Sequence, residues 1–213
     1  MAKTQEPSRN LSEKEDTFRT LSAPSEGLYK EKGSKFLAFA YPVQSEEEIR
    51  RHIESLRKTY YDARHHCYAY VLGVKQEIYR VNDDGEPSST AGKPIYGQIL
   101  SFGLTDVLIV VVRYFGGTKL GTSGLITAYK TASAEALAKA SIVEKTVMRH
   151  YALQFPYEQM NRVMRIVKEL QLQVTGQEAD TECHMKIAVR LSESARCMKK
   201  FQEERIAIQR IDL

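Results

Sequence analysis

The clearest hydrophobic pattern lies in the last third of the chain. From residue 183 to residue 191 every second side chain is apolar, which is typical of a strand with one buried face. A strand at 147–155 and an amphipathic helix starting near Met160 precede it, and a strand at 171–174 follows the helix. A helix capped by Ser192 and a strand at 206–211 complete the pattern. The β-α-β-β-α-β order predicts a ferredoxin-like domain over residues 146–213.

The preceding part of the chain predicts a second domain over residues 27–145. Residues 28–43 have an extended pattern with a turn at Gly33, and Ser45 followed by three glutamates is a typical helix start. Strands are expected at 67–72 and 105–114, and a long helix at 124–140. Residues 105–114 are apolar on both faces, which predicts a central strand. The fold class is therefore α+β with two domains and a boundary near Lys145, preceded by a polar, partly mobile arm over residues 1–26.

Composition limits the functional classes. The chain has 213 residues, 42% hydrophobic side chains and a net charge of +4, which is too mild for a protein that coats DNA. The longest aliphatic run, 107–112, is too short to span a bilayer, and the first thirty residues lack a signal-peptide pattern. Three cysteines do not indicate a disulfide framework. We expect a soluble, cytoplasmic protein with no membrane partner and no readout of DNA sequence.

A glycine-rich segment after the central strand is the most unusual part of the sequence. It carries two cations and leads into the expected long helix, so freed backbone amides and the helix dipole would favour an anion such as a phosphate. The segment is not a Walker loop, because Thr122 stands where the lysine belongs. Tight turns and close packing explain the glycines equally well. The candidate phosphate-binding or nucleic-acid-binding residues are Arg113, Gly116, Gly117, Lys119, Gly121 and Gly124, with Arg64 and Lys93 from neighbouring segments.

Two other segments carry candidate chemistry. Asp83, Asp84 and Glu86 could bind Mg²⁺ through oxygen, but their spacing is not that of an EF-hand, and the same residues favour ordinary turns. His65 and His66 cannot readily share a metal ion, because neighbouring strand residues face opposite ways. We therefore predict no metal site. His66, Asp84 and Glu86 remain candidate catalytic residues, and no cofactor other than Mg²⁺ is indicated.

Taken together, the three segments resemble the Impact/YigZ family. The resemblance rests on 62–67 (Asp-Ala-x-His-His-Cys), 84–94 (Asp-Gly-Glu-Pro-x-x-Thr-Ala-Gly-x-Pro) and 112–121 (Val-Arg-Tyr-Phe-Gly-Gly-Thr-Lys-Leu-Gly). It implies an N-terminal domain similar to a small-subunit ribosomal protein and to domain IV of elongation factor G. It also implies the small ferredoxin-like domain of two-domain bacterial members. Eukaryotic relatives regulate translation, so the resemblance implies a translation-associated role.

The sequence departs from the family pattern at three positions. Ser89 and Ser123 stand where the family usually has glycine, and Thr127 where it usually has arginine. The two serines are expected to avoid left-handed backbone geometry, because each carries a Cβ. With threonine in place of arginine at position 127, the start of the long helix has one cation fewer than in the family, which would weaken anion binding.

Three functional hypotheses follow. The first is a regulatory protein without catalysis that binds RNA or the ribosome through the glycine-rich basic loop. The second is a Mg²⁺-dependent enzyme that acts on a nucleotide or a phosphorylated small molecule, with His66 transferring a proton. The third is a scaffold whose function lies in protein–protein contacts.

Overall fold

The computed structural model describes residues 16–179 and 182–211, and this part of the chain forms two compact units. Unit 1 comprises Phe18–Lys145. Unit 2 comprises residues 146–211 without the two undescribed positions, together with Asp16 and Thr17. Among the described residues no helix is long and apolar enough to cross a membrane. Both units combine helices with an antiparallel sheet, so the fold is α+β with two domains.

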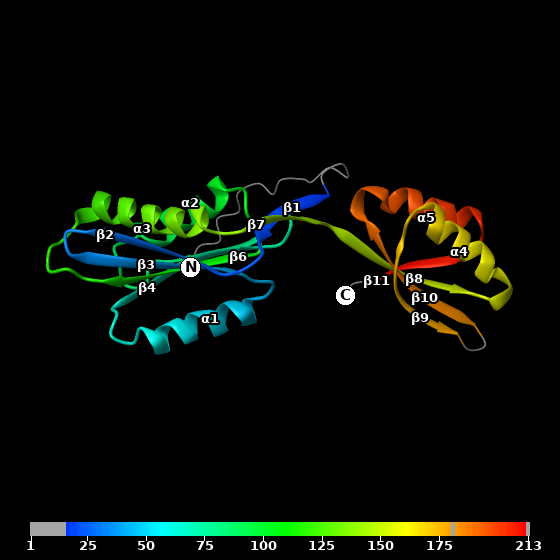
Figure 1. Cartoon of the computed structure of the whole chain (residues 1–213), viewed down its shortest axis with the longest axis horizontal. Coiled ribbons are helices and arrows are strands. Elements are labelled where there is room, and N and C mark those ends of the chain that lie inside the picture. Colours follow the sequence, from blue (N-terminus) through cyan, green and yellow to red (C-terminus); the bar gives the residue numbers. More distant parts are fainter. Residues whose placement is uncertain (1–15, 180–181, 212–213) are drawn as a thin grey trace. The chain divides into compact units, whose positions relative to one another are not determined.

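Unit 1 is built on a five-stranded sheet. The strand order is β2 (Ser25–Glu31), β3 (Ser34–Pro42), β6 (Val107–Tyr114), β4 (His65–Leu72) and β5 (Ile78–Asn82), and every neighbouring pair is antiparallel. Helix α1 (Glu46–Thr59) covers one face, and α2 (Gly92–Ser101) and α3 (Gly121–Ala138) cover the other (Figure 1). Strand β6 is central, as its apolar sequence predicts.

Two apolar cores fill the space on either side of this sheet. Val107, Ile109 and Val111 of β6 belong to the core beneath α2 and α3, whereas Leu108 and Val110 belong to the core beneath α1. All five side chains are fully buried. Because alternate residues of a strand face opposite ways, a strand buried on both sides needs an uninterrupted apolar sequence.

Helix α1 begins as its sequence predicts. The Ser45 hydroxyl accepts a hydrogen bond from the backbone N–H of Glu48 at 3.2 Å. The Glu48 carboxylate in turn accepts one from the N–H of Gln44, the residue before the N-cap, at 2.7 Å. Ile49, Ile53 and Leu56 form the buried stripe of the helix.

The end of the expected N-terminal arm is ordered structure. Residues 1–15 lie outside the described part of the chain, but β1 (Thr17–Leu21) pairs with β7 (Ile142–Thr146) in a two-stranded sheet. Leu21 is only 1% exposed, and the backbone N–H of Ser22 donates to the carbonyl of Ser141 at 2.9 Å. Residues 18–26, which the sequence assigned to the partly mobile arm, thus belong to unit 1, since a distant strand supplies the pairing and burial that the local sequence lacks.

Unit 2 has the predicted β-α-β-β-α-β order. Its elements are β8 (Met148–Phe155), α4 (Met160–Glu169), β9 (Gln173–Ala179), β10 (Cys183–Arg190), α5 (Ser194–Glu203) and β11 (Ala207–Ile211), with short 3-10 turns, η1 (Tyr157–Gln159) and η2 (Leu191–Glu193), before the helices. The sheet order is β11-β8-β10-β9, which is the ferredoxin-like arrangement. The apolar side chains of β8 and β10 pack with Val163 and Phe201 of the two helices.

Ser192 does not cap the last helix. Glu193 occupies the N-cap position of α5 and makes no capping bond, whereas the Ser192 hydroxyl donates to the Asp16 carboxylate at 2.6 Å. Arg190 donates to both oxygens of that carboxylate, at 2.6 and 3.0 Å. The bonds from Arg190 and Ser192 lower the pKa of Asp16 from 3.8 to about 2. Ser192 thus binds Asp16, which is far away in the sequence, instead of capping the helix.

Candidate functional site

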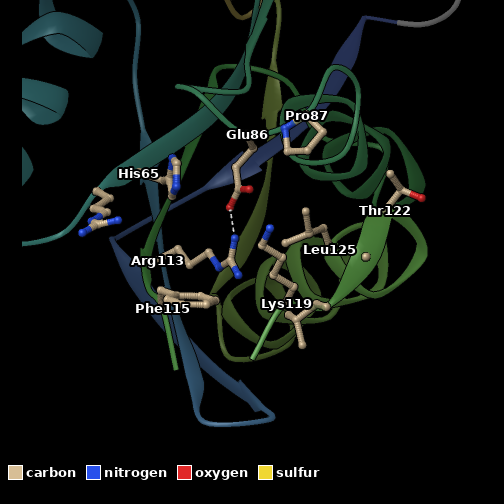
Figure 2. Close-up of a pocket in the computed structure, with 11 residues that line it drawn as sticks. His65, Glu86, Pro87, Arg113, Phe115, Lys119, Thr122 and Leu125 are labelled. Carbon is tan, nitrogen blue, oxygen red and sulfur yellow. Dashed lines mark hydrogen bonds and ion pairs between the residues drawn. The ribbon is translucent and has the colours of Figure 1, made fainter. Parts of the chain in front are cut away.

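The candidate segments of the sequence meet at one pocket in unit 1. The pocket encloses about 470 Å³ beside the start of α3 (Figure 2). Five of the predicted site residues line it, namely Arg64, Glu86, Arg113, Lys119 and Gly121. The other lining residues, which were not among the predicted site residues, are His65, Pro87, Phe115, Leu120, Thr122 and Leu125. The pocket therefore combines cations with apolar walls.

A buried ion pair forms part of the pocket wall. Nη1 of Arg113, near the end of β6, lies 2.6 Å from Oε1 of Glu86, and their side chains are 7% and 4% exposed. Taking both charges out of water is costly, and the attraction between them offsets that cost only with good geometry and further hydrogen bonds. The Tyr129 hydroxyl supplies one of these, since it donates to the same glutamate oxygen at 2.8 Å. Glu86 is therefore held by groups from β6 and α3.

The Arg113 guanidinium keeps unused bonding capacity. Its carbon lies over the ring of Phe36 at 5.4 Å and over the ring of Phe115 at 5.7 Å, within the range of cation–π attraction. Its Nε has no hydrogen-bond partner among the described residues. Such a buried donor without an acceptor is uncommon in proteins. Arg113 lines the pocket, but its Nε is itself buried, so this atom is an unsatisfied donor inside the pocket wall.

Behind the ion pair, Tyr129 and Cys67 are neutral structural groups. The Cys67 sulfur lies 3.3 Å from the Tyr129 hydroxyl oxygen and 3.0 Å from the carbonyl oxygen of Asp83. Burial raises the pKa of the Cys67 thiol and of the Tyr129 hydroxyl, so both stay protonated at neutral pH. A protonated thiol is a poor nucleophile, which fits Cys67 as a small core residue.

The acidic segment shapes its own loop. The Asp83 carboxylate accepts hydrogen bonds from the N–H groups of Ser89, Ala91 and Gly92, at 2.9, 3.0 and 2.8 Å, and so stabilises the start of α2. Ser89 adopts a left-handed backbone with φ of +65°, contrary to the expectation that a serine there would avoid it. The three bonds to one carboxylate hold the loop in this conformation despite the Cβ. The other two departures lie within α3, where Thr127 donates to the carbonyl of Ser123.

Asp84 and Glu86 do not share a cation site. One Asp84 oxygen lies 3.0 Å from Nη2 of Arg57, and the other accepts from the N–H of His66 at 2.6 Å. Glu86 is bound to Arg113, so the two carboxylates serve different cations. Over residues 16–179 and 182–211 no group of three or more His, Cys, Asp or Glu side chains could hold a metal ion.

The two neighbouring histidines have separate environments. His65 lines the pocket, and its Nδ1 lies 2.8 Å from the carbonyl oxygen of Asp84. In the neutral ring Nδ1 therefore carries the proton, which leaves Nε2 as an acceptor. His66 lies on the opposite face of β4 with Tyr68, where burial lowers its pKa. His66 was the candidate for proton transfer, but the histidine at the pocket is His65.

The glycines of the loop have different roles. A Cβ on Gly116 would lie 1.9 Å from the carbonyl carbon of Gly33, so only glycine fits this close approach of two backbones. Gly117 and Gly121 have φ of +87° and +71° with open space around them, and each permits a turn. Gly124 lies within α3, in the first turn after Gly121.

The start of α3 has no side-chain cap. Leu120 is its N-cap residue, so no side chain caps the helix, and the first turn contains no acidic residue. The backbone N–H groups at the start of a helix lack intrahelical partners and carry the positive end of the dipole. Lys119 lies directly before this turn, and Figure 2 shows its side chain extending toward the Arg113–Glu86 pair. Lys93, in contrast, is exposed on α2 and does not line the pocket.

Comparison with known proteins identifies the family. The family model "Impact N-terminal domain" matches residues 32–137, which include every residue lining the pocket. "IMPACT family member in pol 5'region" of Thermus thermophilus is 36% identical over 173 residues, covering 80% of this chain and 92% of that protein. The chain belongs to the IMPACT family.

Other IMPACT family members match over a shorter region. YigZ of Escherichia coli is 37% identical over 144 residues, which cover 67% of this chain and 71% of YigZ. YvyE of Bacillus subtilis is 38% identical over 138 residues, and the match spans 64% of that protein. A solved structure, named "Crystal structure of an hypothetical protein", is similar over 92% of this chain and 98% of its own, with a TM-score of 0.69 and 29% identity.

Proposed function

We propose that this IMPACT family protein binds RNA, free or in the ribosome, through the pocket in unit 1. The observation that carries the proposal is the convergence of Arg64, Lys119 and the uncapped start of α3 on one pocket. Phosphate contacts in nucleic-acid complexes are made by arginine and lysine side chains and by helix N-termini. Neither cation forms an ion pair with a described residue, so both are available to a phosphate.

The role of Arg113 in this proposal differs from that expected from sequence. Its charge is already balanced by Glu86, and it stands in the wall rather than on the surface. It would add a hydrogen-bond donor to a bound phosphate, not a net charge. We assign the charge-dependent part of the affinity to Arg64 and Lys119. A translation-associated regulatory role follows from RNA binding only if the bound RNA belongs to the translation machinery.

The proposal can be tested by measuring the affinity for labelled RNA from its retention on a filter, at salt concentrations between about 50 and 200 mM. Phosphate contacts weaken steeply over this range. We would compare the wild-type chain with Arg64→Gln/Lys119→Gln. Each lost phosphate contact is expected to lower the slope of log affinity against log salt by about 0.7 for a single strand. The matched control, Arg50→Gln/Lys58→Gln, removes two exposed cations from α1, on the opposite face of the sheet. Equal slopes for all three proteins would disprove the proposal.

A second candidate is a nucleotide-binding enzyme, and the size of the pocket favours it. A volume of about 470 Å³ lies within the range of roughly 300–1,000 Å³ that is typical of small-ligand sites. In that case His65, rather than His66, would exchange protons with the ligand through Nε2. Millimolar ATP or GTP would then raise the melting temperature of the wild-type chain, and Lys119→Gln would reduce the shift. A nucleotide-dependent shift without RNA retention would favour this candidate over the first.

The third hypothesis, a scaffold that acts through protein contacts, gains no specific support. It treats the glycines and carboxylates as purely structural, which fits Gly116 and Asp83. It leaves the uncapped helix start and the unpartnered Arg113 Nε at the same pocket without an explanation.

A further inference from the structure

An exposed aromatic ring stands beside the phosphate-binding groups. Phe115 follows β6 directly, lines the pocket and is 50% exposed, although every residue of β6 from Val107 to Arg113 is buried. An exposed ring of this size forgoes burial that the fold could otherwise use. The Arg113 guanidinium lies over the ring at 5.7 Å, which restricts its orientation. The ring therefore presents an exposed apolar surface at the pocket.

The rest of the pocket fits more than a phosphate group. Leu120, Leu125 and Pro87 line it together with the cations. A phosphate needs only donors and positive charge, and it gains nothing from apolar walls. A nucleotide presents both an anionic group and a flat ring, so it matches the two kinds of surface. Successive bases of single strands stack on aromatic side chains in proteins of many folds.

Stacking in this pocket would require an unpaired base. In a duplex the base faces are covered by their neighbours, and the phosphates lie outside. Phe115 is exposed, but the bases of a double helix are stacked on one another. A rigid duplex could therefore contact the cations of the pocket but could not place the face of a base against the ring. Selection for an unpaired strand therefore follows from the position of the ring.

We infer that the pocket takes one nucleotide of an unpaired RNA strand, whose base stacks on Phe115 and whose phosphate binds Lys119 and the start of α3. This inference rests on the proposed function and adds its substrate class. Phosphate contacts alone would bind duplex and single strand alike. With the stacking contact, the protein prefers single strands.

The absence of tryptophan from the chain makes a direct test available. Phe115→Trp introduces a sole tryptophan at the pocket, and a base stacked on it should quench its emission. We would titrate this variant with an unstructured twelve-nucleotide RNA and with the same RNA paired to its complement. The matched control is Tyr157→Trp, at a side chain that is 71% exposed in unit 2. We expect quenching of Phe115→Trp by the single strand, weak or no quenching by the duplex, and none in the control.

A second variant makes the test independent of the tryptophan. Phe115→Leu keeps an apolar side chain but removes the stacking surface, and filter retention of the single strand should weaken about 5- to 150-fold, the range for one stacked base. Retention of the duplex should not change. Equal quenching by both RNAs, or unchanged single-strand affinity in Phe115→Leu, would overturn the inference. If the inference failed in this way but Arg64→Gln/Lys119→Gln still weakened RNA retention, the proposed RNA binding would stand without the stacking contact. If the wild-type chain retained no RNA, the proposed function and this inference would both fail.

Discussion

Unit 1 and unit 2 both cover a sheet with helices, but they bury different chemistry. Unit 1 encloses the Arg113–Glu86 ion pair together with Tyr129 and Cys67, whereas the core of unit 2 consists of apolar side chains with a hydrogen bond between Tyr151 and Ser194. Eleven of the twelve glycines in the chain lie in unit 1. Unit 2 thus forms an α+β fold with one glycine and, among its described residues, no ion pair in which both partners are buried. Departures from simple packing are expected at functional sites, and here the Arg113–Glu86 pair and Gly121 line the pocket.

The largest expected effect comes from breaking the ion pair of unit 1. Arg113→Met leaves the Glu86 carboxylate buried without its cation, which should lower the free energy of unfolding by about 3–5 kcal/mol. Replacing both residues, as in Arg113→Met/Glu86→Leu, should recover most of this loss, because no uncompensated charge remains. The free energy of unfolding of both variants can be measured by urea denaturation, with hydrogen exchange in peptides of unit 1 as the readout. If Arg113→Met alone were as stable as the wild type, the ion pair would not be buried in solution.

The next largest expected effect is a difference in stability between alanine substitutions at two glycines of unit 1. Gly116→Ala forces a Cβ into the backbone of Gly33 and should destabilise the chain by about 1–3 kcal/mol. Gly97→Ala lies in α2 with nothing within 4 Å of the added Cβ, so it should stabilise the helix by about 0.5–1 kcal/mol. The same denaturation measurement tests both. Equal effects of the two substitutions would contradict the close approach at Gly116.

The smallest effect concerns the main charged contact of unit 2. Because the folded pKa of Asp16 is lowered to about 2 from 3.8, its contribution to stability is complete above pH 3.8 and declines as the pH falls toward 2. Asp16→Asn should therefore be less stable than the wild type at pH 7 by about 1 kcal/mol or less, because the partner Arg190 is half exposed. This difference should shrink between pH 4 and pH 2. A difference that does not change with pH would mean that Asp16 does not bind Arg190 as a carboxylate.

Much of the fold follows from local pattern. The alternation from Cys183 to Val189 predicts which face of β10 is buried, and the doubly apolar β6 predicts its central position. Strand β5 escapes prediction, because Ile78 and Tyr79 in this edge strand are exposed and show no alternation. Strand β1 escapes it for a related reason. Its pairing with β7 joins residues more than a hundred positions apart, and no local window contains that information.

The candidate site was predictable in outline but not in its details. The three segments that meet at the pocket stand out in the sequence, and strand alternation shows that His65 and His66 face opposite ways. Which histidine faces the pocket depends on the position of α1, and the pairing of Arg113 with Glu86 depends on sheet geometry. Phe115 could have been found from one signal, an aromatic residue between a buried strand and a glycine pair.

The placement of Asp16 and Thr17 in unit 2 affects how the chain responds to cleavage. The backbone passes into unit 1 after Thr17 and leaves it after Lys145, so two crossings connect the units. A protease that cuts after Lys145 would leave the contacts of Asp16 with Arg190 and with the N–H of Val147 intact at first. Because the charged contact contributes about 1 kcal/mol or less, it is too weak to hold two separate fragments together. The two fragments would therefore separate in gel filtration.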